Sequence, residues 1–302
     1  MEFENIIGNT EVKKYLSNTI KQNNILHSYL FLGTEGIGKL LIAKAFAKKI
    51  LCHNREKNDC RCKSCLCFEG QNHPDFIVIN EQGESIKIEQ IRNITEKVIE
   101  KPIVSSKKVY IINDCDKMTK EAQNCLLKTL EEPPEFAIII LISSNENLIL
   151  NTIKSRCMSI KFNNISNNEL KDYAKKNLGY ITVTENILSS FHGSIGKAIK
   201  QKNYQEKYVQ IEELISHMST KDIVDIMLEA KILYDKENIS DILDYIIVCL
   251  FSCAKQNDKY IGCIKYVNTC LERLRSNSNF DMSVDSMLLN IWEELNESSY
   301  RC

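Results

Sequence analysis

The stretch "SYLFLGTEGIGKL" (residues 28–40) decides the fold, because it joins a strand pattern to a glycine-rich turn and a helix. Residues 28–33 form an apolar run that predicts a buried strand, and residues 39–52 have the composition and spacing of a helix. Between them, "GTEGIGKL" (33–40) fits seven of the eight positions of the phosphate-binding pattern G-x-x-x-x-G-K-[ST]. The stretch therefore predicts a strand–loop–helix unit of the phosphate-loop type.

Short apolar runs alternate with helical patterns along the first half of the chain. Besides 28–33, the sequence predicts strands at 76–80, 108–113, 137–143 and 158–162, with helices at 39–52, 86–100 and 120–132. Strands that alternate with helices form βαβ units, and almost purely apolar strands indicate a parallel sheet covered on both faces. After about Phe162 only helical patterns remain. We expect an α/β domain over 1–163, a small helical domain over 164–204 and a larger all-α domain over 205–302.

The composition limits the classes of function. Of the 302 residues, 43% are apolar and the net charge is −1, so no global field attracts DNA or a membrane. The first ten residues lack the pattern of a signal peptide, and no run of 18 apolar residues predicts a membrane span. We therefore expect a cytoplasmic protein. Its thirteen cysteines are then reduced thiols or metal ligands rather than a disulfide framework.

The loop residues Gly33, Gly36, Gly38 and Lys39 have the shape and the charge of a phosphate site. Backbone N–H groups of such a turn form a concave anion site at a helix N-terminus, and Lys39 would reach the outer phosphates. Leu40, however, stands where a Ser or Thr hydroxyl normally holds magnesium. The alternative interpretation is a tight strand-to-helix turn without a ligand.

The end of the predicted strand at 108–113 also differs from the pattern of an active phosphate-loop ATPase. A phosphate-loop ATPase has Asp-Glu at this place, where Asp orients the magnesium shell and Glu polarises the attacking water. This chain has the neutral Asn113, followed by Asp114, which is one methylene shorter than Glu. Together with Leu40 these residues predict a degenerate site that holds no magnesium. The alternative is that they simply end a buried strand.

A cysteine cluster occupies a polar segment at 52–67. Cys62 and Cys65 have zinc-knuckle spacing, and Cys52 lies far enough back to complete a four-sulfur tetrahedron with them. Cys60 and Cys67 offer one thiol more than is needed. Because four thiolates leave no open position for water, the predicted zinc is structural. Incidental free thiols are the alternative.

Arg156 in "KSRC" (154–157) follows the fourth predicted strand by some ten residues. An Arg on a polar loop of a nucleotide-type domain can act as an arginine finger on a neighbour's γ-phosphate. The alternative is a solvated side chain, and the residues alone favour that alternative.

Together these motifs resemble the bacterial clamp-loader family of AAA+ proteins. The likeness rests on "HSYLFLGTEGIGK", the cysteines before "NHPDF", "KVYIINDCDKMTKEAQNCLLKTLEEPP" and "SRC". These segments are similar to the delta-prime and gamma/tau subunits of DNA polymerase III over roughly residues 1–200, and delta-prime is the better match. The resemblance implies an AAA+ domain with a zinc-binding insertion (52–67), a helical lid domain and a C-terminal collar for oligomerisation.

The resemblance also implies roles for particular residues. Arg156 would be a finger acting in trans, sensor 1 would fall near Ser144, and sensor 2 would be Lys197 in place of the family's Arg. The implied zinc ligands are Cys52, Cys60, Cys62 and Cys65, with Cys67 as the alternate to Cys60. That alternate arises because one residue separates Cys60 from Cys62, where the family usually has two.

A delta-prime-like chain would be a ring member of the polymerase III holoenzyme without ATPase activity of its own. ATP binding would be weak or absent, and magnesium is not expected. The implied partners are the gamma/tau and delta subunits and, through the complex, the sliding clamp and primer–template DNA. One alternative is an active gamma/tau-type ATPase that uses Lys39 and Asp114. Another, disfavoured by the near-neutral charge, is a zinc-dependent nucleic-acid-binding module.

Overall fold

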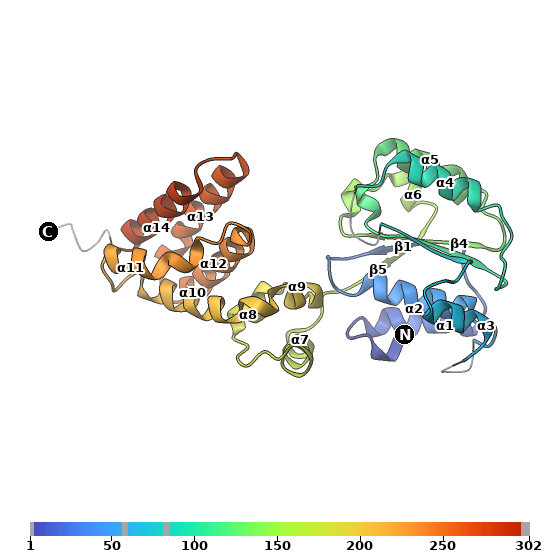
Figure 1. Ribbon diagram of the computed structural model, residues 1–302, viewed down its shortest axis with the longest axis horizontal. Coiled ribbons are helices and arrows are strands. Elements are labelled where there is room, and N and C mark those ends of the chain that lie inside the picture. Colours follow the sequence, from blue (N-terminus) through green and yellow to red (C-terminus); the bar gives the residue numbers. More distant parts are fainter. Residues whose placement is uncertain (1–2, 56–59, 81–84, 297–302) are drawn as a thin grey trace. The chain divides into compact units, whose positions relative to one another are not determined.

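The computed structural model describes residues 3–55, 60–80 and 85–296 of the chain (Figure 1). These residues fold into two compact units. The first runs to Glu169 and includes Ser194–Gly196, and the second comprises Leu170–Gly193 and the residues from Lys197 on. The division of the helical region at 164–204 and 205–302 stays a prediction. Parts of two predicted regions, 56–59 and 297–302, lie outside the described residues.

A five-stranded parallel sheet forms the centre of the first unit. Its order is β2-β3-β4-β1-β5, with every neighbouring pair parallel. The strands are β1 (Ser28–Leu32), β2 (Phe76–Ile79), β3 (Lys108–Ile112), β4 (Ala137–Ser143) and β5 (Met158–Lys161). The predicted α/β class is confirmed. Four strands end one residue earlier than predicted; after β2, for example, Asn80 turns to a positive φ of 61°.

Helices cover both faces of this sheet (Figure 1). One face carries α1 (Thr10–Lys21), α2 (Lys39–Leu51) and α3 (Lys63–Glu69), and the other carries α4 (Ile88–Lys97), α5 (Lys120–Glu131) and α6 (Asn151–Lys154). Tyr29 and Phe31 belong to the core on the α2 side, whereas Leu30 and Leu32 belong to the core on the α5 side. This alternation explains why β1 is apolar at every position after Ser28.

The parallel arrangement gives the sheet two functionally distinct edges. All strands begin at one edge, here called the amino edge, and all end at the other, the carboxyl edge. The loop after β1 and the residues after β3 and β4 leave from the carboxyl edge. The residues just before β2, β3 and β5 lie at the amino edge. Because β4 lies between β1 and β3, one strand separates the phosphate loop from Asn113.

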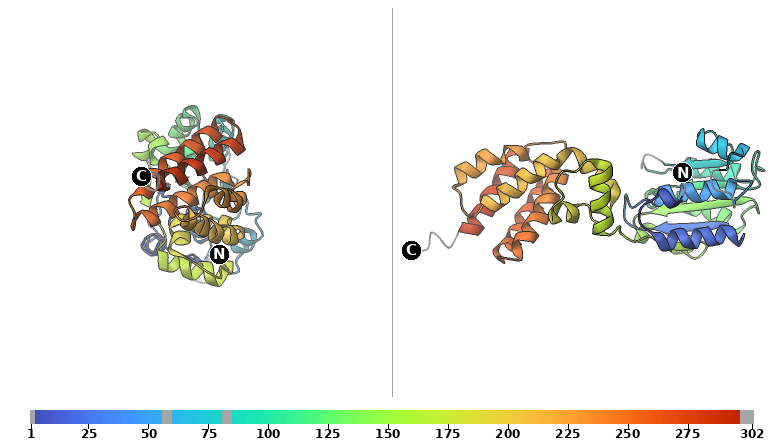
Figure 2. Two further views of the ribbon diagram at one scale, coloured as in Figure 1. Left: turned by 90° about the vertical axis from the view of Figure 1, so that its left-hand side faces the viewer. Right: turned by 90° about the horizontal axis from the view of Figure 1, so that it is seen from below.

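The second unit is helical, and no strand occurs in its described residues, 170–193 and 197–296. Figure 2 gives two further views of its helices. They are α7 (Asn167–Tyr173, beginning in the first unit) with the π turn η4 (Ala174–Leu178), α8 (Glu185–Ser190), α9 (Ile195–Lys200), α10 (Gln205–His217), α11 (Ile223–Glu229), α12 (Ile239–Ala254), α13 (Lys259–Arg275) and α14 (Phe280–Asn296). Short 3₁₀ turns complete the chain: η1 (Phe3–Asn5), η2 (Cys115–Lys117), η3 (Glu146–Leu148), η5 (Gln201–Tyr204) and η6 (Ala230–Leu233). Among the helices in the described ranges, none is long and apolar enough to span a bilayer.

Candidate functional site

The phosphate loop follows β1 in the conformation that its glycines predict. Gly36 and Gly38 have φ values of 76° and 93°, a region that side chains other than hydrogen rarely adopt. A Cβ atom at Gly33 would lie 2.8 Å from the carbonyl oxygen of Phe162, so this position also excludes a larger residue. Helix α2 begins directly behind the loop at Lys39. The backbone therefore has the strand–turn–helix form of an anion-binding loop.

Lys39 is turned onto the backbone of its own loop. Its Nζ donates hydrogen bonds to the carbonyl oxygens of Gly33 (2.5 Å) and Thr34 (2.7 Å), and the residue is 7% exposed. Burial lowers the pKa of the Lys39 ammonium, and the carboxylates of Asp114 and Asp116 partly offset that effect. The amine therefore stabilises the loop in this structure. The carboxylates of Asp114 and Asp116 make the electrostatic potential near Lys39 less positive, which disfavours a bound phosphate.

Leu40 takes part in packing. It is half-buried and packs against the core on the α2 side of the sheet. The position that supplies a metal-binding hydroxyl in the full motif thus presents an alkyl side chain to the core.

Asn113 and Asn80 join the ends of β3 and β2. The Asn113 side-chain amide donates to the carbonyl oxygen of Asn80 (3.2 Å), and the Asn80 amide donates to that of Asn113 (3.3 Å). Asp114 has a φ of 49° and forms an ion pair with Lys117 at 3.3 Å. The amide that replaces a magnesium-orienting carboxylate is therefore used for strand-end hydrogen bonds.

Ser144, the predicted sensor-1 residue, is bound to a carboxylate that sequence reasoning did not single out. Its Oγ donates to Oδ2 of Asp116 at 2.9 Å. The other oxygen, Oδ1, is buried and has no hydrogen-bond partner among the residues that the structure describes. Asp116 lies in η2, two residues after Asp114, and the acidic spacing in "NDCD" was the available signal.

Lys197, the predicted sensor-2 residue, belongs to the second unit. It lies in α9, where its Nζ is 3.5 Å from Nδ1 of His192. The structure therefore describes Lys197 within that unit, beside a histidine.

Arg156 lies at the amino edge, between α6 and β5. Its guanidinium donates through Nη1 to the carbonyl oxygen of Thr152 (2.9 Å), and Nη2 is 2.6 Å from Oε1 of Glu131. The Oγ of Ser28, the first residue of β1, donates to the carbonyl oxygen of Arg156 at 2.6 Å. Five-residue β1 spans roughly 16 Å, so Arg156 and Gly33 lie at opposite ends of the strand.

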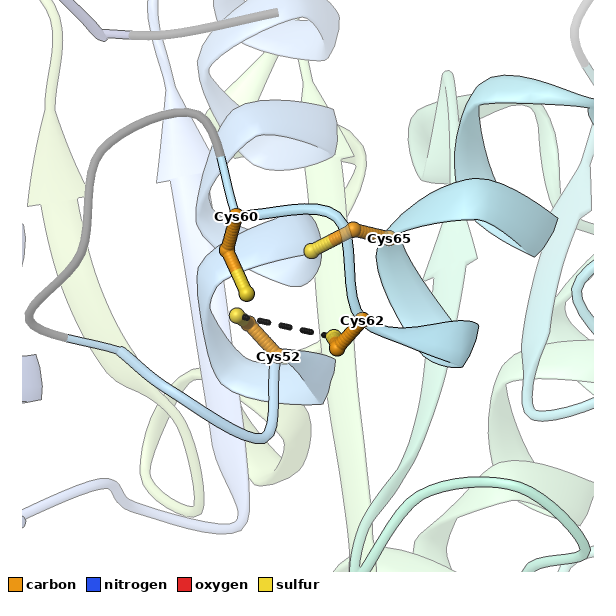
Figure 3. A group of neighbouring side chains, drawn as sticks. All are labelled: Cys52, Cys60, Cys62 and Cys65. Atoms are coloured by element: carbon orange, nitrogen blue, oxygen red, sulfur yellow. Dashed lines mark hydrogen bonds between the residues drawn. The ribbon is translucent and has the colours of Figure 1, made fainter.

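Four cysteine side chains converge beside α3 (Figure 3). Cys52 follows the end of α2, Cys60 and Cys62 precede α3, and Cys65 lies in its first turn. Their four Sγ atoms all lie within 4.8 Å of one another. Tetrahedral zinc with Zn–S bonds of about 2.3 Å needs sulfurs roughly 3.8 Å apart, so a small inward shift would complete the site. Cys67, the predicted alternate, is not a member of this group.

The electrostatics of the cluster suit a metal. Burial alone would raise the pKa of Cys62, but backbone hydrogen bonds at Cys65 and His53 and the neighbouring thiols bring it down to about 6. Burial raises the pKa of Cys65, and the adjacent thiols of Cys52 and Cys62 raise it further. A cation would replace the proton that the Cys65 thiol otherwise keeps. Four sulfur donors could hold a metal, and such a set favours zinc among common divalent ions.

A buried polar cluster, not foreseen from the sequence, supports the cysteines. His73 Nε2 lies 2.9 Å from Oγ of Ser64, and the hydroxyls of Ser64 and Ser105 both donate to the carbonyl oxygen of Leu51 (2.8 and 2.9 Å). His73 Nδ1 accepts the backbone N–H of Asp75 at 3.0 Å. His73 therefore requires its neutral form, with the proton on Nε2. We call Leu51, Ser64, His73, Asp75 and Ser105 the histidine hub.

The histidine hub connects the cysteines to the sheet. Leu51 and Ser64 immediately precede Cys52 and Cys65. The Asp75 carboxylate accepts the backbone N–H groups of residues 103, 104 and 105 at 2.7, 2.8 and 2.8 Å. Although burial raises it, these three bonds hold the pKa of Asp75 below its usual range. The backbone segments that carry Cys52 and Cys65 are thereby fixed to the segments that lead into β2 and β3.

Comparison with known protein families shows to which family the chain belongs. The family model described as "DNA polymerase III, delta subunit" matches residues 8–166, just over half of the chain. The chain belongs to the DNA polymerase III clamp-loader family. The AAA+ type of the first unit, its parallel sheet and its phosphate loop are those expected of this family.

Curated relatives of this clamp-loader chain include a delta' subunit as well as gamma and tau/gamma subunits. It is 38% identical over 162 residues to subunit delta' of Bacillus subtilis, which covers 53% of this chain and 49% of the relative. It is 34% identical over 187 residues to subunit tau/gamma of Haemophilus influenzae (61% and 26%). It is 32% identical over 237 residues to subunit gamma of Buchnera aphidicola from Acyrthosiphon pisum (74% and 63%). The chain thus spans less than two thirds of the length of each.

A solved structure supports the fold over nearly the whole clamp-loader chain. A gamma subunit-related protein from Thermotoga maritima aligns with a TM-score of 0.55 at 18% identity, covering 93% of this chain and 99% of that one. At this identity the similarity concerns the fold alone. It agrees with an α/β AAA+ unit followed by a helical region.

Proposed function

We propose that this chain is a delta-prime-type subunit of the DNA polymerase III clamp loader. It hydrolyses no ATP itself and supplies Arg156 to the active site of an adjacent subunit. The observation that carries the proposal is the location of Arg156 at the amino edge, one strand length from its own phosphate loop. A guanidinium at that edge can serve only a nucleotide that another chain brings to it.

The carboxyl edge supports the absence of hydrolysis by this chain. Leu40 packs into the core, the Asn113 amide binds Asn80, and the Ser144 hydroxyl binds Asp116. None of these groups offers the magnesium ligands or the positioned base that phosphoryl transfer requires. We therefore propose that ATP binds weakly or not at all and that no magnesium is held.

The proposed partners are the gamma/tau and delta subunits, with the sliding clamp and primer–template DNA reached through the complex. Relatives named as delta', gamma and tau subunits support this assignment, and it would locate the chain in the cytoplasm. We further propose that 164–204 form a lid and 205–302 a collar. Large apolar side chains exposed on α11 and α14, among them Val224, Leu228 and Met282, support a role in contacts between subunits.

We also propose that Cys52, Cys60, Cys62 and Cys65 hold one structural zinc ion. The convergence of four thiols and the histidine hub behind them support this role. With four protein ligands the ion would fix the local fold and would carry no reaction.

The test is reconstitution of the loader with wild-type chain or with Arg156→Ala. Loss of an arginine finger costs about 10³-fold or more at the site that it serves. The DNA-stimulated ATPase of the complex should therefore fall by the share of one site. Arg156→Lys should restore little, because lysine lacks the planar fork. Lys161→Ala, an exposed cation on β5, is the matched control.

Three outcomes would contradict this proposal. An unchanged rate with Arg156→Ala would show that Arg156 is not an arginine finger. Magnesium-dependent hydrolysis by the isolated chain, abolished by Lys39→Ala, would establish an active gamma/tau-type ATPase. Tight DNA binding by the isolated chain at physiological salt would instead favour the nucleic-acid-binding module.

A further inference from the structure

Two of the segments that carry the family likeness, "LLKTLEEPP" and "SRC", meet at the amino edge. Helix α5 ends at Glu131, two residues before Pro133, which cannot continue a helix. The Glu131 carboxylate lies 2.6 Å from Nη2 of Arg156, although 25 positions (156 − 131) separate the two residues in the chain. The proposed finger accounts for Arg156 but leaves the acidic end of α5 without a role.

The Arg156 side chain is held at both of its terminal nitrogens. Nη1 donates to the carbonyl oxygen of Thr152 (2.9 Å) and contacts Oγ of Ser155 (3.3 Å), while Nη2 contacts Glu131. A guanidinium has five N–H donors; hydrogen bonds to Thr152 and Ser155 use those on Nη1, and Nη2 is paired with Glu131. No residue that the structure describes accepts a hydrogen bond from Nε, so Nε and the outer side of Nη2 can together bind a phosphate.

We propose that Glu131 is a positioning residue for the arginine finger, orienting the Arg156 guanidinium toward the phosphate of an adjacent subunit. This inference rests on the proposed function of Arg156. Glu131 fixes the Nη2 side of the guanidinium, and the Thr152 carbonyl fixes the Nη1 side. Groups that are oriented before the reaction stabilise its transition state without reorganising.

The exposure of the ion pair suits this role. The Arg156 and Glu131 side chains are 33% and 47% exposed. An ion pair exposed to this extent contributes little to the stability of the fold. The contact thus favours one orientation of the guanidinium and leaves the side chain accessible to a phosphate from another chain.

The experiment measures ATP hydrolysis by the reconstituted loader with variants of this chain. Because the finger serves one site, the quantity compared is the part of kcat that Arg156→Ala removes. With Glu131→Ala we expect that part to fall about 3–10-fold and KM for ATP to change less than about twofold, since the finger acts in the transition state. Glu131→Gln keeps an acceptor oxygen at the same place and should retain at least about half of that part. Glu132→Ala is the matched control, because its exposed side chain makes no hydrogen bond or ion pair with the residues that the structure describes.

A double variant separates positioning from other effects. Adding Glu131→Ala to Arg156→Ala should cause no loss beyond that of Arg156→Ala, because both changes remove one function. A further loss in the double variant, or a wild-type kcat for Glu131→Ala while Arg156→Ala is impaired, would overturn the role of Glu131 and leave the finger intact. A normal rate for Arg156→Ala would overturn the finger itself and this inference with it.

Assembly and melting of each variant complex are measured alongside the kinetics. Where Glu131→Ala fails to fold or to assemble, Glu131→Asp replaces it. Aspartate is one methylene shorter and cannot reach Arg156 in the same geometry, so it should lower kcat below that of Glu131→Gln. Equal rates for the Asp, Gln and wild-type chains would contradict the proposal.

Discussion

The polar groups at the two edges of the central sheet have different partners. At the carboxyl edge the phosphate loop, Asn113 and Ser144 bind other parts of the same chain. At the amino edge the histidine hub supports four converging thiols, and the Nε donor of Arg156 has no acceptor among the described residues. The carboxyl edge thus has the backbone form of a nucleotide site, while these polar groups bind within the same chain.

The comparison teaches that backbone motif and chemistry can be separated. The glycines of the loop preserve its conformation, which also shapes the start of α2 and the packing against Phe162. This structural role alone would be enough to preserve "GTEGIGK" in a chain that bound no magnesium. The amino edge has no such familiar backbone motif, and the roles proposed for it would depend on side chains brought together from distant segments.

Metal removal should have the largest effect, and it should affect the amino edge alone. With Cys65→Ser we expect the metal content to fall from about one ion per chain to almost none. Structural zinc binding is worth about 10–16 kcal/mol in small domains, so a large drop in melting temperature should accompany the loss. Elemental analysis and thermal melting are the measurements. Cys67→Ser, outside the group of four thiols, should keep the metal.

A fully folded wild-type chain that contains no metal and melts at the same temperature with and without a chelator would contradict this prediction. The cysteine segment at the amino edge would then be stabilised by hydrogen bonds and packing within the chain, as the phosphate loop is at the carboxyl edge.

Lys39→Ala should weaken the carboxyl edge without changing ATP hydrolysis by the loader. The change leaves the carbonyl oxygens of Gly33 and Thr34 without their donor, which should cost about 1–3 kcal/mol of unfolding free energy. Denaturant titration of the chain and ATPase assays of the complex test both parts. Lys14→Ala, which removes an exposed ion pair with Glu11, should change stability by less than about 0.5 kcal/mol. A large loss of ATP hydrolysis by the loader with Lys39→Ala would mean that the carboxyl edge of this chain takes part in catalysis.

Asp116→Asn should make the carboxyl edge more receptive to anions. Removing one carboxylate near Lys39 favours phosphate by about 1 kcal/mol, which corresponds to ATP binding roughly 5–10-fold tighter. Calorimetric titration of wild type and variant with ATP provides the measurement. Glu121→Gln removes an exposed carboxylate at the start of α5 and should have no effect. Equal affinities of the Asp116→Asn and wild-type chains would show that the local field does not limit binding.

The smallest effect concerns pH and the histidine hub. Burial lowers the pKa of His73, so its folded value lies below the ordinary value of about 6.5. A lowered histidine pKa means that protonation favours the unfolded chain. The contribution of the hub is therefore complete above about pH 6.5 and is lost as pH falls below it. The His73→Asn variant should show a shallower loss of stability between about pH 7 and 5 than wild type.

The control for this pH dependence is His27→Asn, which replaces an exposed histidine. Its stability should follow the wild-type pH profile. A His73→Asn profile parallel to that of wild type would mean that the protonation of His73 does not affect stability.

The sequence predicted the features that depend on local pattern. The glycine loop, the five apolar strands, the helical second half and the spacing of Cys62 and Cys65 all follow from neighbouring residues. The same local reasoning identified Leu40 and Asn113 as departures, since a motif can be read position by position.

Features that depend on tertiary contacts were not accessible in this way. The hub draws on Leu51, Ser64, His73 and Ser105, and no regular spacing connects these positions. The Glu131–Arg156 pair joins the end of one helix to the start of a strand that are distant in sequence. The loop motif also does not predict whether the Lys39 ammonium binds a ligand or the carbonyl oxygens of its own loop. Such pairings arise from the strand order, which brings β1 between β4 and β5.

The link between Ser28 and Arg156 has a consequence for assembly symmetry. Through β1, one rigid element ties the proposed finger at the amino edge to the loop at the carboxyl edge. A finger-to-loop contact between chains is therefore heterologous, and repeated contacts of this kind run in one direction around a ring. A chain that donates a finger but has no working loop ends such a series. It would give an otherwise repetitive ring a fixed first position and a direction.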